Sequence, residues 1–197
     1  MSERVGPAGG WPGTGGPDGL VLGDVLITEA EITSRICELA EEISTDYEGR
    51  SPLLVGVLKG AFVFMADLAR AIRLPVEMDF MAVSSYGAAT KTSGIVRIVK
   101  DLDVDLTGRH VIIVEDIVDS GLTLSYLRKG LMARGPASLE ICALLVKEGQ
   151  QRTSTRVAYT GFDIPPEFVV GYGLDVAERW RNLPDIRLAH ARGVVPA

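Results

Sequence analysis

The sequence has few cysteines and few histidines, and this shortage excludes two classes of site. Cys37 and Cys142 are its only cysteines, and His110 and His190 are its only histidines. Two cysteines are too few for a disulfide framework, and neither pair has the spacing of metal ligands. Both cysteines stand among apolar neighbours in the sequence, so we expect two buried, reduced thiols.

Long apolar runs and an excess of basic residues are also missing. No run approaches the ~18 residues that span a membrane, and the first residues do not have the basic-then-apolar order of a secretory signal. The formal net charge of −6 argues against broad nucleic-acid binding, because a phosphate backbone requires a basic face. We therefore expect a cytoplasmic protein with no nucleic-acid or membrane partner. A small phosphorylated ligand needs only a few donors and is compatible with this charge.

The composition is that of a globular domain with one atypical end. Hydrophobic residues make up 47% of the 197 residues and charged residues 23%, which is an ordinary balance for a folded protein. Residues 1–19 are rich in glycine and proline and bury too little surface to offset their ordering entropy, so we predict a flexible tail there. Residues 20–197 are expected to form a single domain with a continuous core.

The patterning predicts an α/β fold. Thr28 and Glu31 form a capping-box pattern, and apolar residues at helical spacing follow it. Strands that alternate with helices of this length imply a mostly parallel central sheet flanked by helices on both faces. The short strands and turns after Phe162 indicate a small hood, formed mainly by residues 163–190. Further helices are predicted over 61–72 and 122–134, and strands over 53–58, 76–83, 95–99, 111–114 and 139–146.

The segment after the most apolar strand, 111–114, carries the candidate chemistry. In open parallel sheets, ligands bind beyond the carboxyl ends of the strands. Glu115 and Asp116 follow this strand directly, and two adjacent carboxylates repel each other and lose hydration. A ribose cis-diol with Mg²⁺ nearby would suit such a pair. The turn 119–123 then opens a helix, whose free N–H groups favour a monophosphate. For the turn alone, an ordinary N-cap is an equal alternative, because Asp and Ser are common there.

The run 111–123, VIIVEDIVDSGLT, resembles the phosphoribosyl-pyrophosphate motif of the type I phosphoribosyltransferases. The resemblance implies the α/β fold of that family, with a small hood subdomain. It also implies that Glu115 and Asp116 hold the ribose hydroxyls and that the following loop cradles the 5′-phosphate. The residues of this phosphate loop are Asp119, Ser120, Gly121, Leu122 and Thr123.

Two short segments resemble the hypoxanthine-guanine branch of that family. Leu58-Lys59-Gly60 is similar to its pyrophosphate-binding loop, which has a non-proline cis peptide before the lysine, and Lys59 and Gly60 would bind phosphoribosyl pyrophosphate. Taken alone, this tripeptide is more often a loop with a solvated lysine. The segment 84–87 resembles the mobile loop of the branch, in which Ser85 and Tyr86 would close over the reacting centre and exclude water.

The stretch 168–175 resembles the hood of the hypoxanthine-guanine branch and is its most specific match. By this likeness Phe168 would stack on the purine, and Val169 would offer backbone groups to the edge of the base. Asp175 would bind a Mg²⁺ shared with pyrophosphate. Glu115 and Asp116 are the other candidate metal ligands.

Two cations and a carboxylate complete the expected site. Arg181 occupies the position expected to contact pyrophosphate, and Lys147 matches the lysine that donates to the 6-oxo group of the purine. Such a lysine favours 6-oxopurines over adenine, whose amino group cannot accept that bond. Asp119 is the candidate general base for the proton on purine N7. The resemblance therefore implies a homo-oligomeric purine-salvage enzyme, a dimer or tetramer, that uses Mg²⁺ to make IMP or GMP from phosphoribosyl pyrophosphate.

Three alternatives stay open. The enzyme could use another base, such as xanthine or a pyrimidine, although the stretch 168–175 disfavours a pyrimidine. The chain could be a non-catalytic regulator that binds RNA or DNA, although such a protein would want a basic face. It could also be an inactive homologue. Glu148-Gly149 stands where many relatives have a proline and Val176 replaces a frequent tyrosine, and both departures bear on base preference.

Overall fold

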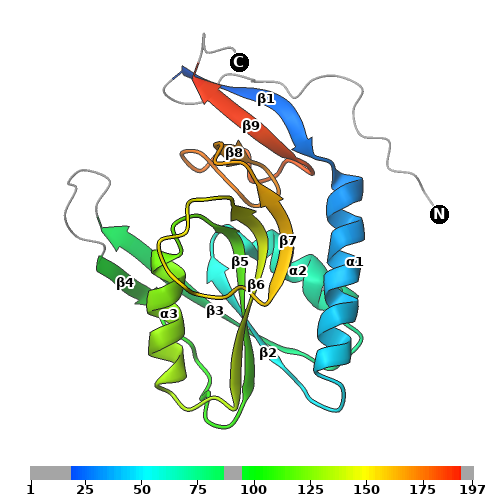
Figure 1. Ribbon diagram of the computed structural model, residues 1–197, viewed down its shortest axis with the longest axis vertical. Coiled ribbons are helices and arrows are strands. Elements are labelled where there is room, and N and C mark those ends of the chain that lie inside the picture. Colours follow the sequence, from blue (N-terminus) through cyan, green and yellow to red (C-terminus); the bar gives the residue numbers. More distant parts are fainter. Residues whose placement is uncertain (1–18, 87–94, 192–197) are drawn as a thin grey trace.

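The computed structural model describes residues 19–86 and 95–191, which form a large and a small sheet (Figure 1). The large sheet has the strand order β4-β3-β2-β5-β6-β7. Neighbouring strands are parallel except for β3 and β4, which are antiparallel. The predicted mostly parallel sheet is therefore confirmed. Its strands are β2 (Leu53–Leu58), β3 (Glu77–Tyr86), β4 (Ile95–Lys100), β5 (His110–Val118), β6 (Ser138–Lys147) and β7 (Tyr159–Ile164).

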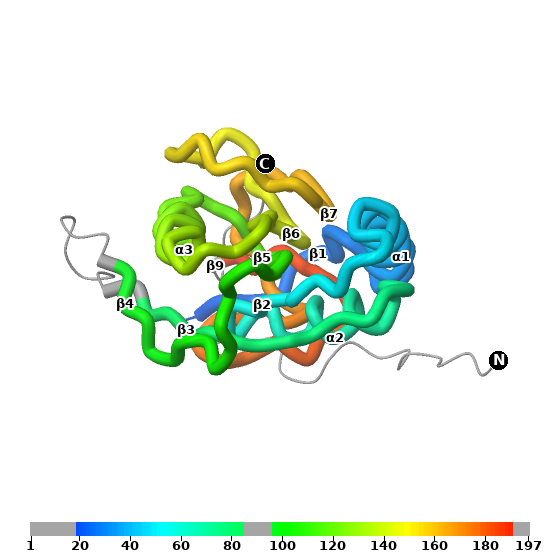
Figure 2. The backbone as a smooth tube through the Cα atoms, turned by 90° about the horizontal axis from the view of Figure 1, so that it is seen from below, coloured from blue at the N-terminus to red at the C-terminus, as the bar shows by residue number. Residues whose placement is uncertain are grey.

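Helices cover both faces of this sheet, as the alternating pattern predicts. The helices are α1 (Glu29–Asp46), α2 (Ala61–Ala71) and α3 (Leu122–Met132). Figure 2 shows α3 on one side and α1 with α2 on the other. Successive residues of a strand point to opposite faces, and β5 follows this rule. Ile112 packs in the core cluster with α1 and α2, whereas Ile113 packs in the cluster with α3.

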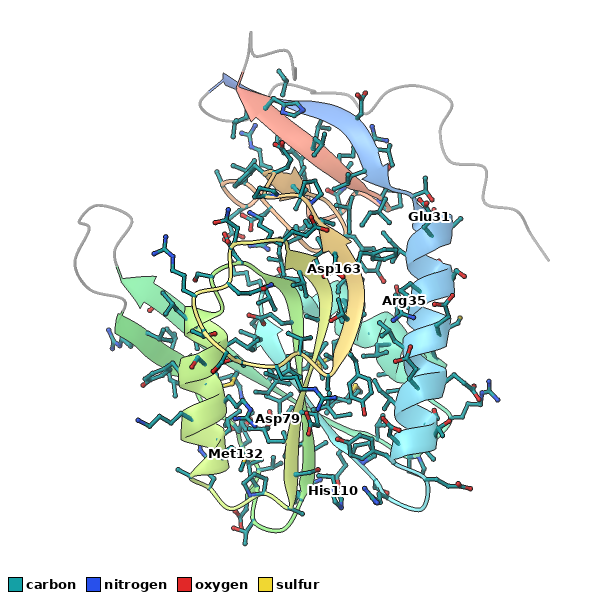
Figure 3. The ribbon with its side chains drawn as sticks, viewed as in Figure 1. Glu31, Arg35, Asp79, His110, Met132 and Asp163 are labelled. Atoms are coloured by element: carbon teal, nitrogen blue, oxygen red, sulfur yellow. The ribbon has the colours of Figure 1, made fainter. Side chains whose placement is uncertain are left out.

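The N-terminus of α1 is fixed by the predicted capping box. The Glu31 N–H donates to Thr28 Oγ1 at 3.3 Å, and the Thr28 N–H donates to Glu31 Oε2 at 2.8 Å. Arg35 attaches the middle of the helix to β7 (Figure 3), because its Nη2 donates to the Thr160 carbonyl at 2.8 Å. The buried face is the predicted one: Ile32, Ile36, Leu39, Ala40 and Ile43.

The expectation of two buried thiols is half wrong. Cys142 is fully buried in β6, and burial raises the pKa of its thiol well above the ordinary value. Cys37 is exposed. It follows the buried Ile36 in the sequence, but consecutive residues of a helix point about 100° apart, so an apolar neighbour in the sequence does not make Cys37 part of the apolar face.

The observed boundaries differ from the predicted ones mainly at the ends of elements. β2 has the predicted bounds, whereas α3 ends at Met132, two residues early, close to Gly135 with its positive φ of 71°. β3 continues beyond its predicted end to Tyr86, because its outer half pairs with β4. The expected mobile loop begins with the backbone of Ser85 and Tyr86, and its remainder at 87–94 lies outside the described residues, as does the expected tail up to residue 18.

A small antiparallel sheet covers one end of the large sheet. It has the strand order β1-β9-β8 and contains β1 (Leu20–Ile27), β8 (Val169–Val170) and β9 (Ile186–Ala191). Figure 1 shows it beyond the arrowheads of β5, β6 and β7, the carboxyl ends of those strands. β1 comes from outside the segment expected to form the hood. Within the described ranges, no helix is long and apolar enough to cross a membrane.

Candidate active site

The candidate residues gather at one edge of the large sheet because their strands are parallel neighbours. β2, β5 and β6 end at Leu58, Val118 and Lys147, respectively. Lys59 and the phosphate loop follow the first two strands directly, and Lys147 is the last residue of the third. The peptide bond between Leu58 and Lys59 is cis, as the resemblance implies.

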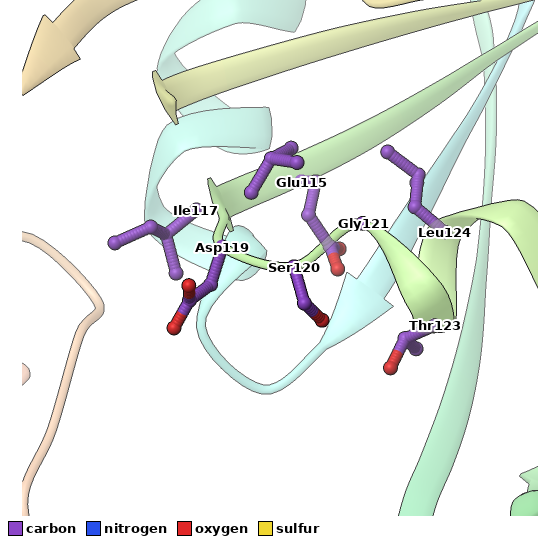
Figure 4. A pocket seen from close by; sticks show the side chains of 8 residues that line it. Glu115, Ile117, Asp119, Ser120, Gly121, Thr123 and Leu124 are labelled. Carbon is purple, nitrogen blue, oxygen red and sulfur yellow. The ribbon is translucent and has the colours of Figure 1, made fainter. Parts of the chain in front are cut away.

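The phosphate loop surrounds a small cavity at the start of α3 (Figure 4). The cavity has a volume of about 150 Å³. The N-cap of α3 is Gly121, with a left-handed φ of 73°, and within the described part of the chain no side chain caps the helix. The hydroxyl Ser120 Oγ is 3.5 Å from the Leu122 nitrogen, at the limit of a hydrogen bond. The first N–H groups of α3 are thus available to an anion, and the ordinary Asp or Ser N-cap is not what forms. The cavity is lined by Glu115, Ile117, Val118, Asp119, Ser120, Gly121, Thr123 and Leu124.

The two adjacent carboxylates of β5 bind their protons unusually tightly. Burial, reinforced by the charge of Asp116, raises the pKa of Glu115 well above its ordinary value. Burial also raises the pKa of Asp116 to about 6, against the opposing effect of the Ile117 N–H that donates to it at 2.8 Å. Glu115 Oε2 is buried and has no hydrogen-bond partner among the described residues. Such an oxygen is costly to leave unpaired, and the hydroxyls of a ribose would supply the missing donors.

Glycines let three segments of the site touch. A Cβ on Gly60 would lie 1.5 Å from Asp116 Oδ2, so any side chain there would displace the carboxylate. A Cβ on Gly173, whose φ is +99°, would lie 2.2 Å from the Gly60 carbonyl oxygen. The Lys59-Gly60 loop is therefore held between β5 and the segment expected to form the hood.

Arg181 is fixed by contacts within that segment. Its Nη1 donates to the Gly173 carbonyl at 2.8 Å, and its Nη2 is 2.8 Å from Asp175 Oδ1. The charge of Arg181 lowers the pKa of Asp116, and the charge of Asp175 raises it. The predicted ribose, pyrophosphate and metal residues therefore lie near one another at this edge of the sheet.

The residues expected to serve the base lie beside the phosphate loop and in the small sheet. Lys147 Nζ is 3.5 Å from Asp119 Oδ2, and the lysine side chain is only 14% exposed whereas Asp119 is 58% exposed. In the small sheet, Val169 is buried and pairs with Leu188, while Phe168, just before β8, is 49% exposed. A half-exposed ring beside a fixed backbone suits stacking on a planar ligand.

The carboxylates fit a magnesium ion that is held partly by substrate. In the described ranges no group of three or more histidine, cysteine or acidic residues converges on one point. Mg²⁺ is usually bound by only one or two carboxylates together with substrate phosphates, and Asp116 and Asp175 offer such oxygens around Arg181.

Two features of the site have no counterpart in the sequence-based prediction. The segment after β6 lies against the phosphate loop, because the Arg152 N–H donates to the Ser120 carbonyl at 2.9 Å. Thr153 Oγ1 is 2.8 Å from where a Cβ on Gly121 would lie. Glu178 pairs with Lys59 at 3.1 Å. Neither contact follows from local spacing, because the partners are far apart in the sequence.

The structure has a mostly parallel sheet, a small cavity at the start of a helix with Glu115 in its wall, and a second, small sheet. This is the arrangement that the motif at 111–123 implies for a phosphoribosyltransferase. A family model described as "Phosphoribosyl transferase domain" matches residues 27–177. The hypoxanthine-guanine phosphoribosyltransferase of Mycobacterium bovis is 55% identical over 165 residues, which cover 81% of this chain and 82% of that protein. The chain therefore belongs to the hypoxanthine-guanine phosphoribosyltransferase family.

Two further relatives agree with this membership. A hypoxanthine phosphoribosyltransferase of Salmonella typhimurium is 52% identical over 163 residues, covering 82% of this chain and 92% of that protein. The crystal structure of a hypoxanthine-guanine phosphoribosyltransferase from Bacillus anthracis has a TM-score of 0.82 and 47% sequence identity, covering 85% of this chain and 98% of that chain. The family and the fold implied by the motif at 111–123 are therefore confirmed.

Proposed function

We propose that this protein is a purine-salvage enzyme that transfers the 5-phosphoribosyl group of phosphoribosyl pyrophosphate to N9 of hypoxanthine or guanine. The products are IMP or GMP and pyrophosphate. The observation that carries the proposal is the start of α3, which no side chain caps within the described ranges and whose cavity is lined by Glu115, with Asp116 next to it in β5. The cavity fits a 5′-phosphate, and the carboxylates fit the ribose hydroxyls of the same molecule.

Asp119 and Lys147 give the site its chemistry toward the base. The Lys147 ammonium would donate to the 6-oxo group of the purine, which adenine does not have. Asp119, 3.5 Å from that ammonium, would accept the proton from purine N7 while N9 attacks the anomeric carbon. Phe168 would stack on the purine, and the Val169 backbone would bind its edge.

Lys59, Gly60 and Arg181 would bind the pyrophosphate that leaves. Asp116 and Asp175 would hold a Mg²⁺, which neutralises charge on the pyrophosphate when it is bound. Glu115 is also a candidate metal ligand by resemblance, and its buried Oε2, which has no hydrogen-bond partner among the described residues, suits a ribose hydroxyl. The Ser85-Tyr86 loop closing over the centre, a cytoplasmic location and a homodimer or homotetramer stay predictions from the family resemblance.

A base panel tests the proposal directly. The purified protein is incubated with phosphoribosyl pyrophosphate, Mg²⁺ and one of hypoxanthine, guanine, xanthine, adenine or uracil, and nucleotide formation is followed. We expect nucleotide from hypoxanthine or guanine, none from adenine or uracil, and no product after chelation of Mg²⁺. Binding of phosphoribosyl pyrophosphate without product from any base would contradict the proposal and would favour an inactive homologue or a regulator.

A further inference from the structure

Glu178 lies between the two cations that the proposed function assigns to pyrophosphate. Its Oε2 is 3.1 Å from Lys59 Nζ and 3.4 Å from Arg181 Nη2. Hydrogen bonding to Lys59 and the charges of both cations lower the pKa of Glu178, so the side chain is an anion at neutral pH. One carboxylate thus neutralises cations from both sides of the site.

A tight turn presents this carboxylate. Val176 and Arg179 exchange two backbone hydrogen bonds, of 3.3 and 3.1 Å, around Ala177 and Glu178. These two central residues have φ angles of +48° and +63°. Such a two-residue turn favours Asn-Gly, and a positive φ is unfavourable for other side chains. Unfavourable backbone of this kind persists where the surroundings hold it and is common at functional sites.

The turn is also tied to the candidate magnesium ligand. The Glu178 N–H donates to Asp175 Oδ2 at 2.8 Å, while Arg181 Nη2 is 2.8 Å from Asp175 Oδ1. Glu178 therefore has a defined position relative to Asp175 and Arg181.

We propose that Glu178 is an internal counter-anion, a positioning residue that occupies Lys59 and Arg181 in the free enzyme and is displaced by the pyrophosphate group. As the pyrophosphate product leaves, Glu178 competes with it for the two cations and so favours its release. The inference rests on the proposed function, because it takes Lys59 and Arg181 as the pyrophosphate ligands.

The exposure of the pair suits such an exchange. The side chains of Lys59 and Glu178 are 66% and 64% exposed. Exposed ion pairs change an equilibrium by at most about fivefold each, so a pyrophosphate that carries several charges and forms charge-assisted hydrogen bonds can displace the carboxylate. A buried pair would be far harder to break.

Binding of inorganic pyrophosphate to Glu178→Gln tests the role without relying on catalysis. Calorimetry with MgCl₂ and pyrophosphate should show binding about two- to tenfold tighter than to the wild-type protein, because the Glu178 carboxylate no longer competes for Lys59 and Arg181. Product inhibition by pyrophosphate should strengthen by the same factor. Unchanged or weaker binding would overturn the inference, since a residue that only organises Lys59 and Arg181 would help the ligand.

The salt dependence gives a second, independent readout. In the wild-type protein, pyrophosphate replaces an anion that is already present, whereas in Glu178→Gln it meets uncompensated cations. Added KCl should therefore weaken pyrophosphate binding more steeply in the variant. Equal slopes would contradict the exchange. Glu48→Gln, which removes the same charge from an exposed residue just after α1, is the matched control and should leave both the affinity and the slope unchanged.

The outcomes separate this inference from the proposed function. Nucleotide formation by the wild-type protein, with no tighter pyrophosphate binding by Glu178→Gln, refutes only the role of Glu178. A wild-type protein that neither forms nucleotide nor binds pyrophosphate refutes both. If Glu178→Gln does not fold, Glu178→Asn removes the charge with a residue that tolerates a positive φ, and the same binding results are expected.

Discussion

The two halves of β5 are both extended strand, but the first half is wholly apolar from Val111 to Val114 and the second half carries two carboxylates. From Val111 to Val114 the strand is fully buried, and it pairs with β2 on one side and β6 on the other. From Glu115 to Val118 only β6 continues beside it. The carboxylates appear at the residue where β2 stops pairing. The first half contributes apolar burial to stability, whereas the second half keeps unpaired and partly charged groups at the sheet edge, and we infer that binding is the reason.

Asp119→Asn, beyond the second half of β5, should have the largest effect, and on turnover alone. Loss of a general base typically costs about 10²–10⁴-fold in rate, while an amide of the same size preserves the shape of the phosphate loop. Steady-state kinetics with hypoxanthine should show this fall in kcat, and calorimetry should show little change in the Kd of phosphoribosyl pyrophosphate. Equal losses in kcat and affinity would mean that Asp119 only shapes the loop.

Ile113→Ala, in the first half, should reduce stability without changing the chemistry. Ile113 is fully buried in the cluster with α3, and truncation of a buried isoleucine costs about 2–5 kcal/mol. Urea denaturation should measure this loss, with a smaller loss of about 0.5–1.5 kcal/mol for Ile113→Val. A large fall in kcat in protein that remains folded would contradict the assignment of stability to the first half and of chemistry to the second.

Asp116→Asn should stabilise the protein, and more so at higher pH. The pKa of Asp116 is about 6 in the folded protein and 3.8 in the unfolded chain, so the folded state binds the proton more tightly. The stabilisation that comes from this tighter proton binding is complete below pH 3.8 and is lost as the pH rises through 6. The variant should therefore exceed the wild type by up to about 3 kcal/mol near pH 8, with a smaller difference at pH 5.

Urea denaturation of both proteins between pH 5 and pH 8 checks this trend. A variant that is less stable than the wild type at pH 8 would show that Asp116 is well satisfied in the folded protein. The same substitution should weaken binding of phosphoribosyl pyrophosphate, because an amide is a poorer acceptor for the ribose hydroxyls.

Two glycines of the same region should respond in opposite directions to alanine. Gly121 has a φ of +73°, which an alanine adopts at a cost of about 1–2 kcal/mol. Gly130 lies inside α3, and a Cβ there would meet nothing within 4 Å, so Gly130→Ala should stabilise by about 0.5–1 kcal/mol. Thermal melting of the two variants measures the contrast. Equal shifts would show that the left-handed start of α3 is not required.

The local parts of this structure could be predicted, and the contacts between distant segments could not. The capping box at Thr28 and the apolar run at 111–114 are local signals, and both formed as predicted. β1 was not predicted because its partner is β9, at the other end of the described chain. Glu178 was missed for the same reason, since it pairs with Lys59 from another segment. Cys37 was wrongly predicted to be buried, because its apolar sequence neighbours were considered without the rotation of about 100° between consecutive residues of a helix.

The pairing of β1 with β9 has a consequence for how the protein folds. Most strands of the large sheet pair with a strand that is next in the sequence, and β2 with β5 is the exception, whereas the small sheet requires both ends of the described chain to meet. Closing so long a loop is entropically expensive and slows folding. During synthesis, β9 leaves the ribosome after every strand of the large sheet. We therefore expect the sheet that carries Val169 to form last, so that a nascent chain acquires its phosphate loop before the proposed base pocket.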